Sequence, residues 1–163
     1  MRSFETQRHG GHRDTAAATR TSVLSVPLCL SLEGEKVVEL NELSHAIIGA
    51  AIEVHRRLGP GLLESAYRVC LAYELRKRGL SVEEERPFPV VYDDVKLDCG
   101  FRADLIVNEV IVVELKAKSA IHPVDEAQVL SHLRLLKLRL GLLINFHEVK
   151  LVDGVRRVIN GFE

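Results

Sequence analysis

The sequence has few cysteines, no tryptophan and a single methionine among its 163 residues. Cys29, Cys70 and Cys99 lie far apart in the chain, so they suggest neither a disulfide framework nor a Cys-x-x-Cys metal site. No apolar run approaches the roughly 18 residues that a membrane-spanning helix needs. The formal net charge of −1 argues against a protein that coats nucleic acid non-specifically, although it is compatible with a local basic patch. We therefore expect a reduced, cytoplasmic protein that does not bind membranes.

The chain is long enough for one ordinary hydrophobic core, and 47% of its residues are hydrophobic. Residues 1–36 have no apolar period, which predicts a disordered N-terminal extension, one that an upstream start codon would explain. The apolar run Val23 to Leu32 is interrupted by Pro27, follows a long polar region and precedes no A-x-A-like cleavage site, which argues against a signal peptide. The predicted domain is therefore residues 37–163.

Three segments have the apolar spacing of amphipathic helices. The first has Asn41 as its expected N-cap and stops at Gly59-Pro60-Gly61. The second ends at Gly79, and the third opens with Pro123 and carries acidic residues in its first turn. The predicted helices are 40–58, 62–78 and 123–138.

Most of the remaining apolar segments predict strands, and two prolines in the first of them suit an edge position. The next two are expected to form a largely buried hairpin. The predicted strands are 80–91, 95–107, 110–117, 141–146 and 149–151, and 155–159 is a candidate for one further strand. The order α-α-β-β-β-α-β-β indicates an α/β (α+β) fold with a central mixed sheet flanked by helices.

Three ionisable residues, Asp104, Glu114 and Lys116, occur inside the predicted buried hairpin. A buried charge is costly unless it is paired or binds a metal. Side-chain alternation places Glu114 and Lys116 on one face of their strand. A two-residue turn at Asn108-Glu109 would aim Asp104 at the opposite face, whereas an odd-length loop or a bulge would bring the two carboxylates together. The sequence pattern leaves both alternatives open.

Two carboxylates and a lysine are the groups that a metal-assisted phosphodiester hydrolase needs. One or two carboxylates suffice to hold magnesium, because this ion keeps several of its waters. A nearby lysine can then stabilise negative charge that develops on the phosphate. The alternative is a simple salt bridge between Glu114 and Lys116 where the strand meets water.

An ordered set of motifs covers roughly residues 40–160. The segment 61–67, GLLESAY, matches the signature GxxExxY and follows AAIEVH at 50–55. Further matches are FRADL at 101–105, VELKA at 113–117, Gln128, and GLLINF at 141–146. The chain thereby resembles the GxxExxY protein family, which is similar to the PD-(D/E)XK nuclease superfamily. Ala103 stands where the superfamily name has proline, a departure that affects no catalytic residue.

The resemblance implies a restriction-endonuclease-like core that uses Mg²⁺ or Mn²⁺. It implies metal-binding roles for Asp104, Glu114 and Glu64, and catalytic roles for Lys116 and Gln128. Taken without the resemblance, Glu64 fits a solvated helix carboxylate, and Gln128, one turn before His132, fits an ordinary polar residue. The accessory candidates are His55, Tyr67 and Arg102.

Each of two accessory candidates has a structural alternative. His55 could hydrogen-bond Glu64 or a phosphate, or interact with the dipole at its own helix end. Tyr67 is more often a core residue than a catalytic one. Arg134, Lys137 and Arg139 could line a nucleic-acid path or form a solvated basic face.

The resulting prediction is a magnesium-dependent nuclease that acts on DNA. The alternative is a non-catalytic module that binds nucleic acid or protein and has kept the fold. A degenerate copy should have lost one of the ionisable residues, and none is lost. No DNA-targeting domain is recognisable, so an active enzyme would need a protein partner or would recognise DNA structure.

Overall fold

The computed structural model describes residues 28–161, which form three α-helices, five strands and one short 3₁₀ helix. Their order confirms the predicted succession α-α-β-β-β-α-β-β. Among these residues, no helix combines the length and apolar character needed to cross a membrane. The elements are α1 (Leu28–Leu58), α2 (Glu64–Lys77), β1 (Val82–Tyr92), β2 (Val95–Val107), β3 (Ile111–Lys116), α3 (Pro123–Leu136), β4 (Leu140–Asn145), η1 (Leu151–Gly154) and β5 (Val155–Ile159).

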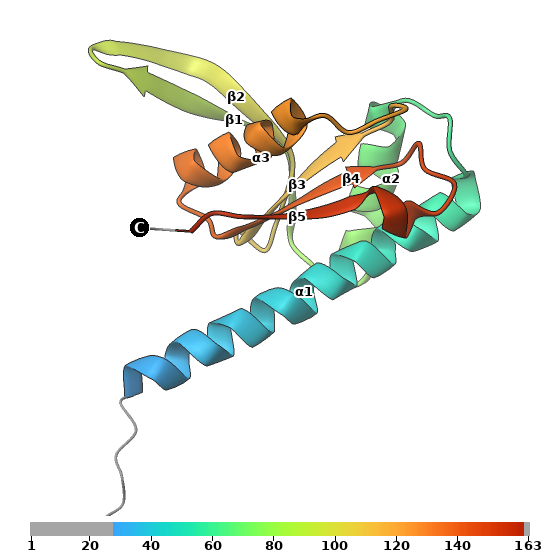
Figure 1. Ribbon diagram of the computed structural model, residues 1–163, viewed down its shortest axis with the longest axis horizontal. Helices are drawn as coiled ribbons and strands as arrows, with labels where there is room; N and C mark the ends of the chain where they lie inside the picture. Colours follow the sequence, from blue (N-terminus) through green and yellow to red (C-terminus); the bar gives the residue numbers. More distant parts are fainter. Residues whose placement is uncertain (1–27, 162–163) are drawn as a thin grey trace, which may run out of the picture.

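The five strands form one mixed sheet in the order β1-β2-β3-β4-β5. Only β3 and β4 run parallel, because α3 connects them as a crossover, and the other neighbouring pairs are antiparallel. The edge position of β1 confirms the interpretation of its two prolines, and the register shifts between Phe88 and Val90. Figure 1 shows the far end of the β1–β2 hairpin extending beyond the rest of the sheet.

Helices cover both faces of the sheet (Figure 1). On one face, Ile47 of α1 and Leu71 of α2 belong to a core cluster that includes Val113 of β3. On the other face, Val129 and Leu133 of α3 pack with residues of β2, β3 and β4. Because side chains alternate along a strand, β3 contributes to both clusters and is buried from both sides.

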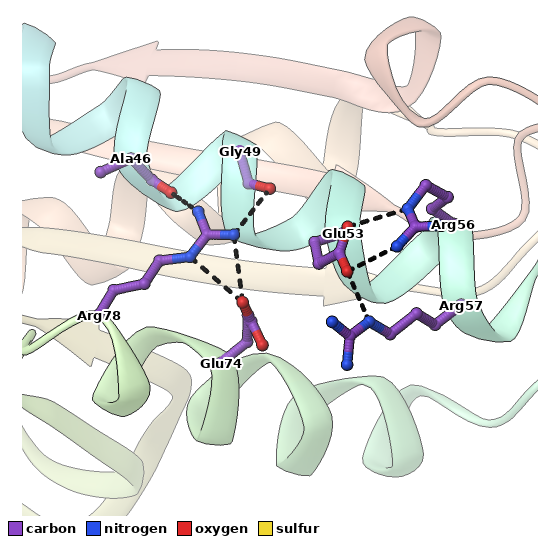
Figure 2. A network of polar contacts seen from close by, with 7 residues as sticks. All are labelled: Ala46, Gly49, Glu53, Arg56, Arg57, Glu74 and Arg78. Carbon is purple, nitrogen blue, oxygen red and sulfur yellow. Dashed lines mark hydrogen bonds and ion pairs between the residues drawn. The ribbon is translucent and has the colours of Figure 1, made fainter.

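Arg78, the residue that follows α2, ties α2 to α1 (Figure 2). Its guanidinium donates to the backbone carbonyl of Ala46 at 3.2 Å and to that of Gly49 at 3.4 Å. The same group is paired with Glu74 of α2 at 3.2 Å. This arrangement fixes the relative position of the two helices that form one layer.

Helix α1 begins at Leu28, well before the predicted start near residue 40. Asn41 is therefore not an N-cap, and its side chain instead accepts a hydrogen bond from Arg157 at 2.7 Å. The first turns of α1 extend away from the sheet (Figure 1), so their sequence carries no core-facing period that could reveal them. Residues 28–36 of the predicted extension are thus helical, and residues 1–27 lie outside the described part of the chain.

The predicted strand at 149–151 is wrong, because a 3₁₀ helix begins at Leu151. The Leu151 side chain is buried in the core cluster beneath α1 and α2. A Cβ atom at Gly154 would lie 2.6 Å from the carbonyl oxygen of Asn145, so only glycine fits this close approach. Glycine at this position therefore lets the chain turn tightly from β4 into β5.

Candidate active site

The connection between β2 and β3 places Asp104 on the same side of the sheet as Glu114. Leu105 pairs with Val113, and Val107 pairs with Ile111, so three residues form the turn. Its first two residues, Asn108 and Glu109, adopt left-handed backbone conformations, with φ of 49° and 60°. The paired residues end at Leu105 and Val113, and this register extended by one residue would set Asp104 opposite Glu114. The three-residue loop confirms the odd-length alternative.

A backbone hydrogen bond fixes the Asp104 side chain. Its Oδ2 atom accepts from the backbone amide of Leu115 at 2.8 Å. Leu115 lies between Glu114 and Lys116 in β3, so the carboxylate of β2 is bound to the middle of the ionisable segment. The structure thus brings together the three residues on which the sequence hypothesis depends.

Lys116 connects Glu114 to helix α3. Its Nζ atom donates to Glu114 Oε1 at 2.6 Å and to the side-chain carbonyl of Gln128 at 3.2 Å. Glu114 is only 3% exposed and Lys116 only 13%. Gln128 comes close to the sheet because α3 packs over Gly141 of β4, where a Cβ atom would lie 2.5 Å from a methyl group of Val129. Gln128 therefore helps to position the ammonium group of Lys116.

Glu64 reaches the end of β3 from the opposite helix layer. Its Oε1 atom accepts from the backbone amide of Ala117 at 3.1 Å. Glu64 is the first residue of α2, so its charge also favours the positive end of the helix dipole. Its place beside the last residues of β3 is compatible with contact to the site through water.

Burial makes the two central carboxyl groups hard to ionise. Burial and the neighbouring charge of Asp104 raise the pKa of Glu114 to about 7, against the opposing effect of the Lys116 hydrogen bond. The pKa of Asp104 is also raised, mainly by burial, although the Leu115 amide and the charge of Lys116 act in the other direction. A further positive charge between the two carboxylates would relieve this cost.

The charge state of Lys116 follows from its partner. Burial disfavours the ammonium, but the hydrogen bond and the charge of Glu114 outweigh burial and raise the pKa of Lys116 above its ordinary value. Lys116 therefore stays positively charged at neutral pH.

His132, one turn after Gln128, is fully buried next to Glu114. Its Nδ1 atom lies 3.6 Å from Glu114 Oε2, which is too long for a hydrogen bond. Burial, followed by the charge of Lys116, lowers the pKa of His132, so the ring is neutral. Glu114 Oε2 and both ring nitrogens have no hydrogen-bond partner among the described residues.

The sequence interpretation missed two charged residues at this site. Arg68 of α2 is paired with Glu85 of β1 at 3.0 Å, and Glu85 is also paired with the accessory candidate Arg102 at 3.2 Å. The positive charge of Arg68 acts on Asp104, where it lowers the pKa. Its spacing of four residues from Glu64 could have revealed Arg68. Glu85 could not be found, because its position depends on the register of β1.

The other two accessory candidates make structural contacts. His55 Nε2 is hydrogen-bonded to the backbone carbonyl of Glu148 at 2.8 Å, so its partner is not Glu64. Tyr67 is fully buried, and its hydroxyl group donates to the carbonyl of Gly59 at 2.7 Å and accepts from the amide of Leu62 at 3.0 Å. Both residues hold the chain around the end of α1.

Three basic residues at the end of α3 and beyond it are exposed, namely Arg134, Lys137 and Arg139. That they line a path for nucleic acid stays a prediction.

The donor set of the site fits a hard divalent cation. Among the described side chains, no group of three or more His, Cys, Asp or Glu residues is arranged to hold a metal ion on its own. Magnesium does not need such a group, because it retains several waters. Glu114 Oε2 is buried without a partner, and the oxygen of a carboxylate is the ligand type that Mg²⁺ and Mn²⁺ prefer. Asp104 and Glu114 are therefore the residues that would bind the ion directly.

The chain was compared with protein families, curated proteins and solved structures. The family model described as the PD-(D/E)XK nuclease superfamily matches residues 41–158, a range that includes every residue of the site. No curated protein and no solved structure matches the chain.

Proposed function

Because the chain belongs to the PD-(D/E)XK nuclease superfamily, we propose that it is a magnesium-dependent nuclease that hydrolyses phosphodiester bonds in DNA. The observation that supports this proposal most strongly is the arrangement of Asp104, Glu114 and Lys116. The Asp104 carboxylate of β2 accepts from the Leu115 amide, next to Glu114 in β3, and Lys116 is paired with Glu114 on the same face of β3.

Asp104 and Glu114 would hold Mg²⁺ or Mn²⁺, with Glu64 acting through water. When bound, the ion supplies Lewis-acid chemistry, because it lowers the pKa of water and offsets negative charge on the phosphate. The two carboxylate oxygens of Glu114 have different roles in this proposal. Its Oε1 atom accepts the hydrogen bond of Lys116, and its Oε2 atom has no protein partner and is available to the ion.

Lys116 would stabilise the negative charge that develops on the attacked phosphate. Its ammonium is held by Glu114 on one side and by Gln128 on the other, so it is oriented before the substrate arrives. Gln128 is in this scheme a positioning residue that acts through Lys116. A preorganised charge in a partly buried site stabilises a transition state more strongly than the same charge in water.

Selection of the DNA target is a further part of this proposal. In this proposal the enzyme recognises DNA structure or is directed to its target by another protein.

A cleavage assay tests the proposal. The purified full chain is incubated with linear, nicked, single-stranded and branched DNA in the presence of Mg²⁺, Mn²⁺ or EDTA. We expect cleavage of at least one substrate with either metal and none in EDTA. The Glu114→Ala variant serves as the matched control, because the same preparation should then lose the activity.

Two results would contradict the proposal. Cleavage that persists in the Glu114→Ala variant would point to a contaminating nuclease. The absence of both cleavage and detectable Mg²⁺ binding would favour the non-catalytic binding module, in which the Lys116–Glu114 ion pair is a structural salt bridge.

A further inference from the structure

Two arginines and one glutamate form a bridge across the first two strands and helix α2. We call Arg68, Glu85 and Arg102 the arginine bridge. Glu85 is ion-paired with both guanidinium groups: its Oε2 atom lies 3.0 Å from Arg68, and its Oε1 atom accepts a hydrogen bond from Arg102 at 3.2 Å. The bridge thus gathers two positive charges around one carboxylate, which leaves a net positive charge.

The two arginines differ in depth. The Arg68 side chain is 18% exposed and that of Arg102 is 65% exposed. The Nε atom of Arg68 is buried without a hydrogen-bond partner among the described residues. A buried guanidinium nitrogen without a partner is unusual in a folded protein, so the packing of Arg68 is not explained by its ion pair with Glu85 alone.

Glu85 has a strained backbone. Its φ of 49° lies in the left-handed region, which a residue with a side chain seldom adopts. It falls between the paired residues Glu84 and Arg86, whose partners in β2 are Leu105 and Ala103. Glu85 therefore lies beside Asp104, on the side of β2 opposite to β3. Strain of this kind is frequent at functional sites.

The bridge adjoins the carboxylates of the proposed metal site. Arg68 follows Glu64 by four residues, so both side chains project from the same face of α2. The charge of Arg68 is close enough to Asp104 to lower its pKa. An anion bound by Arg68 would therefore lie within reach of the metal site.

We propose that the arginine bridge binds a backbone phosphate of the nucleic acid, with Arg68 as the main contact and Glu85 as the residue that orients its guanidinium. This inference rests on the proposed function and assigns to it a substrate-binding residue. A guanidinium suits this role because its planar fork of donors matches two oxygens of a phosphate. Phosphate contacts of this type position a strand without reading its sequence.

Helix α2 offers a matched control for the simpler explanation that Arg68 only attaches α2 to β1. Arg76 lies on the same helix and is paired with Glu84 of β1 at 2.8 Å. It also donates to the backbone carbonyl of Val82 at 2.9 Å. If attachment were the only role, Arg68→Gln and Arg76→Gln would behave alike.

The test measures binding separately from cleavage. Fluorescein-labelled single-stranded and double-stranded DNA are titrated with the full chain in EDTA, and fluorescence anisotropy is followed at several salt concentrations. We expect Arg68→Gln to weaken binding about 10-fold and to reduce the slope of log K against log salt by about one. Arg76→Gln should change neither quantity, and Arg68→Lys should retain the slope while losing part of the affinity. Melting temperatures of all variants show whether they remain folded.

The outcomes distinguish this inference from the proposed function. Equal effects of Arg68→Gln and Arg76→Gln, or no effect of Arg68→Gln, would overturn the role of the arginine bridge while leaving metal-dependent cleavage intact. DNA binding that depends on Arg68 without cleavage in Mg²⁺ would support the bridge and contradict the nuclease. If the wild-type chain bound no DNA in any of these conditions, the proposed phosphate-binding role of the arginine bridge would also be overturned.

Discussion

The carboxylate of Asp104 accepts a hydrogen bond from the backbone amide of Leu115 at 2.8 Å. This bond crosses from β2 to β3 beyond the last backbone pair of the two strands, Leu105 with Val113. Asp104 is therefore a structural acceptor as well as a candidate metal ligand. The two roles can be separated by substitution, because an amide oxygen can replace the acceptor but is a weaker ligand for Mg²⁺.

Asp104→Asn and Asp104→Ala should differ in unfolding free energy, and both should bind Mg²⁺ more weakly than the wild type. The alanine variant leaves the Leu115 amide without its partner, which costs about 1 to 3 kcal/mol of unfolding free energy. The asparagine variant can keep the hydrogen bond and should lose less. Urea unfolding in EDTA measures the difference, and calorimetry should show that both variants bind Mg²⁺ more weakly than the wild type. Equal stability of the alanine variant and the wild type would contradict the structural role of this bond.

The raised pKa of Glu114 predicts a pH-dependent stability in the absence of metal. The pKa of this carboxyl group is about 7 in the folded protein, against the ordinary glutamate value of 4.5 in the unfolded chain. Between these two values the folded state holds a proton that the unfolded state releases. The stabilisation that this proton provides is therefore fully present below the unfolded pKa and is lost as the pH rises through about 7.

Glu114→Gln removes this titration. The unfolding free energy of the variant, relative to that of the wild type, should therefore increase as the pH is raised from about 5 to about 8. We expect a relative gain of about 1 to 3 kcal/mol in EDTA, measured by urea unfolding at both pH values. His132, whose pKa burial lowers, changes stability with pH in the opposite sense, but it is present in both proteins. Parallel pH profiles of the two proteins would show that Glu114 is not buried as described.

Tyr67→Phe should affect stability without affecting the chemistry. The substitution removes the hydroxyl that joins the Gly59 carbonyl to the Leu62 amide, while it keeps the ring that stacks on Phe146 with centroids 4.3 Å apart. We expect a loss of about 1 to 2 kcal/mol of unfolding free energy, because two backbone groups lose a partner. The cleavage rate per folded molecule should be unchanged. A large loss of cleavage at unchanged stability would instead assign Tyr67 to the active site.

The sequence predicted the order of elements because most of them carry strong periodic patterns. The helices α2 and α3 and the buried strands β3 and β4 lie against the core, so apolar spacing and turn residues reveal them. The first turns of α1 extend away from the sheet (Figure 1), and the expected start of that helix was too late for this reason.

The candidate site was predictable only in part. The residues Glu114 and Lys116 share a face by strand alternation alone, which the sequence shows directly. The position of Asp104 depends on whether the turn has two or three residues, and the left-handed conformations of Asn108 and Glu109 that decide this have no glycine to signal them. The position of Glu85 beside Asp104 depends on long-range strand register, which no local pattern contains.

In the proposed mechanism, Glu114 holds the metal while Lys116 stabilises negative charge at the phosphate. The most direct test compares Mg²⁺ affinity by calorimetry with the cleavage rate for Glu114→Ala and Lys116→Ala, after melting temperatures have shown that both are folded. Glu114→Ala should lose Mg²⁺ binding and cleavage together, because it removes a ligand. Lys116→Ala should bind Mg²⁺ at least as tightly as the wild type, because Glu114 Oε1 is then released, and should still lose about 10²- to 10³-fold in cleavage rate. If Lys116→Ala cleaved DNA at the wild-type rate, or if Glu114→Ala retained full Mg²⁺ affinity, this division of roles would be contradicted.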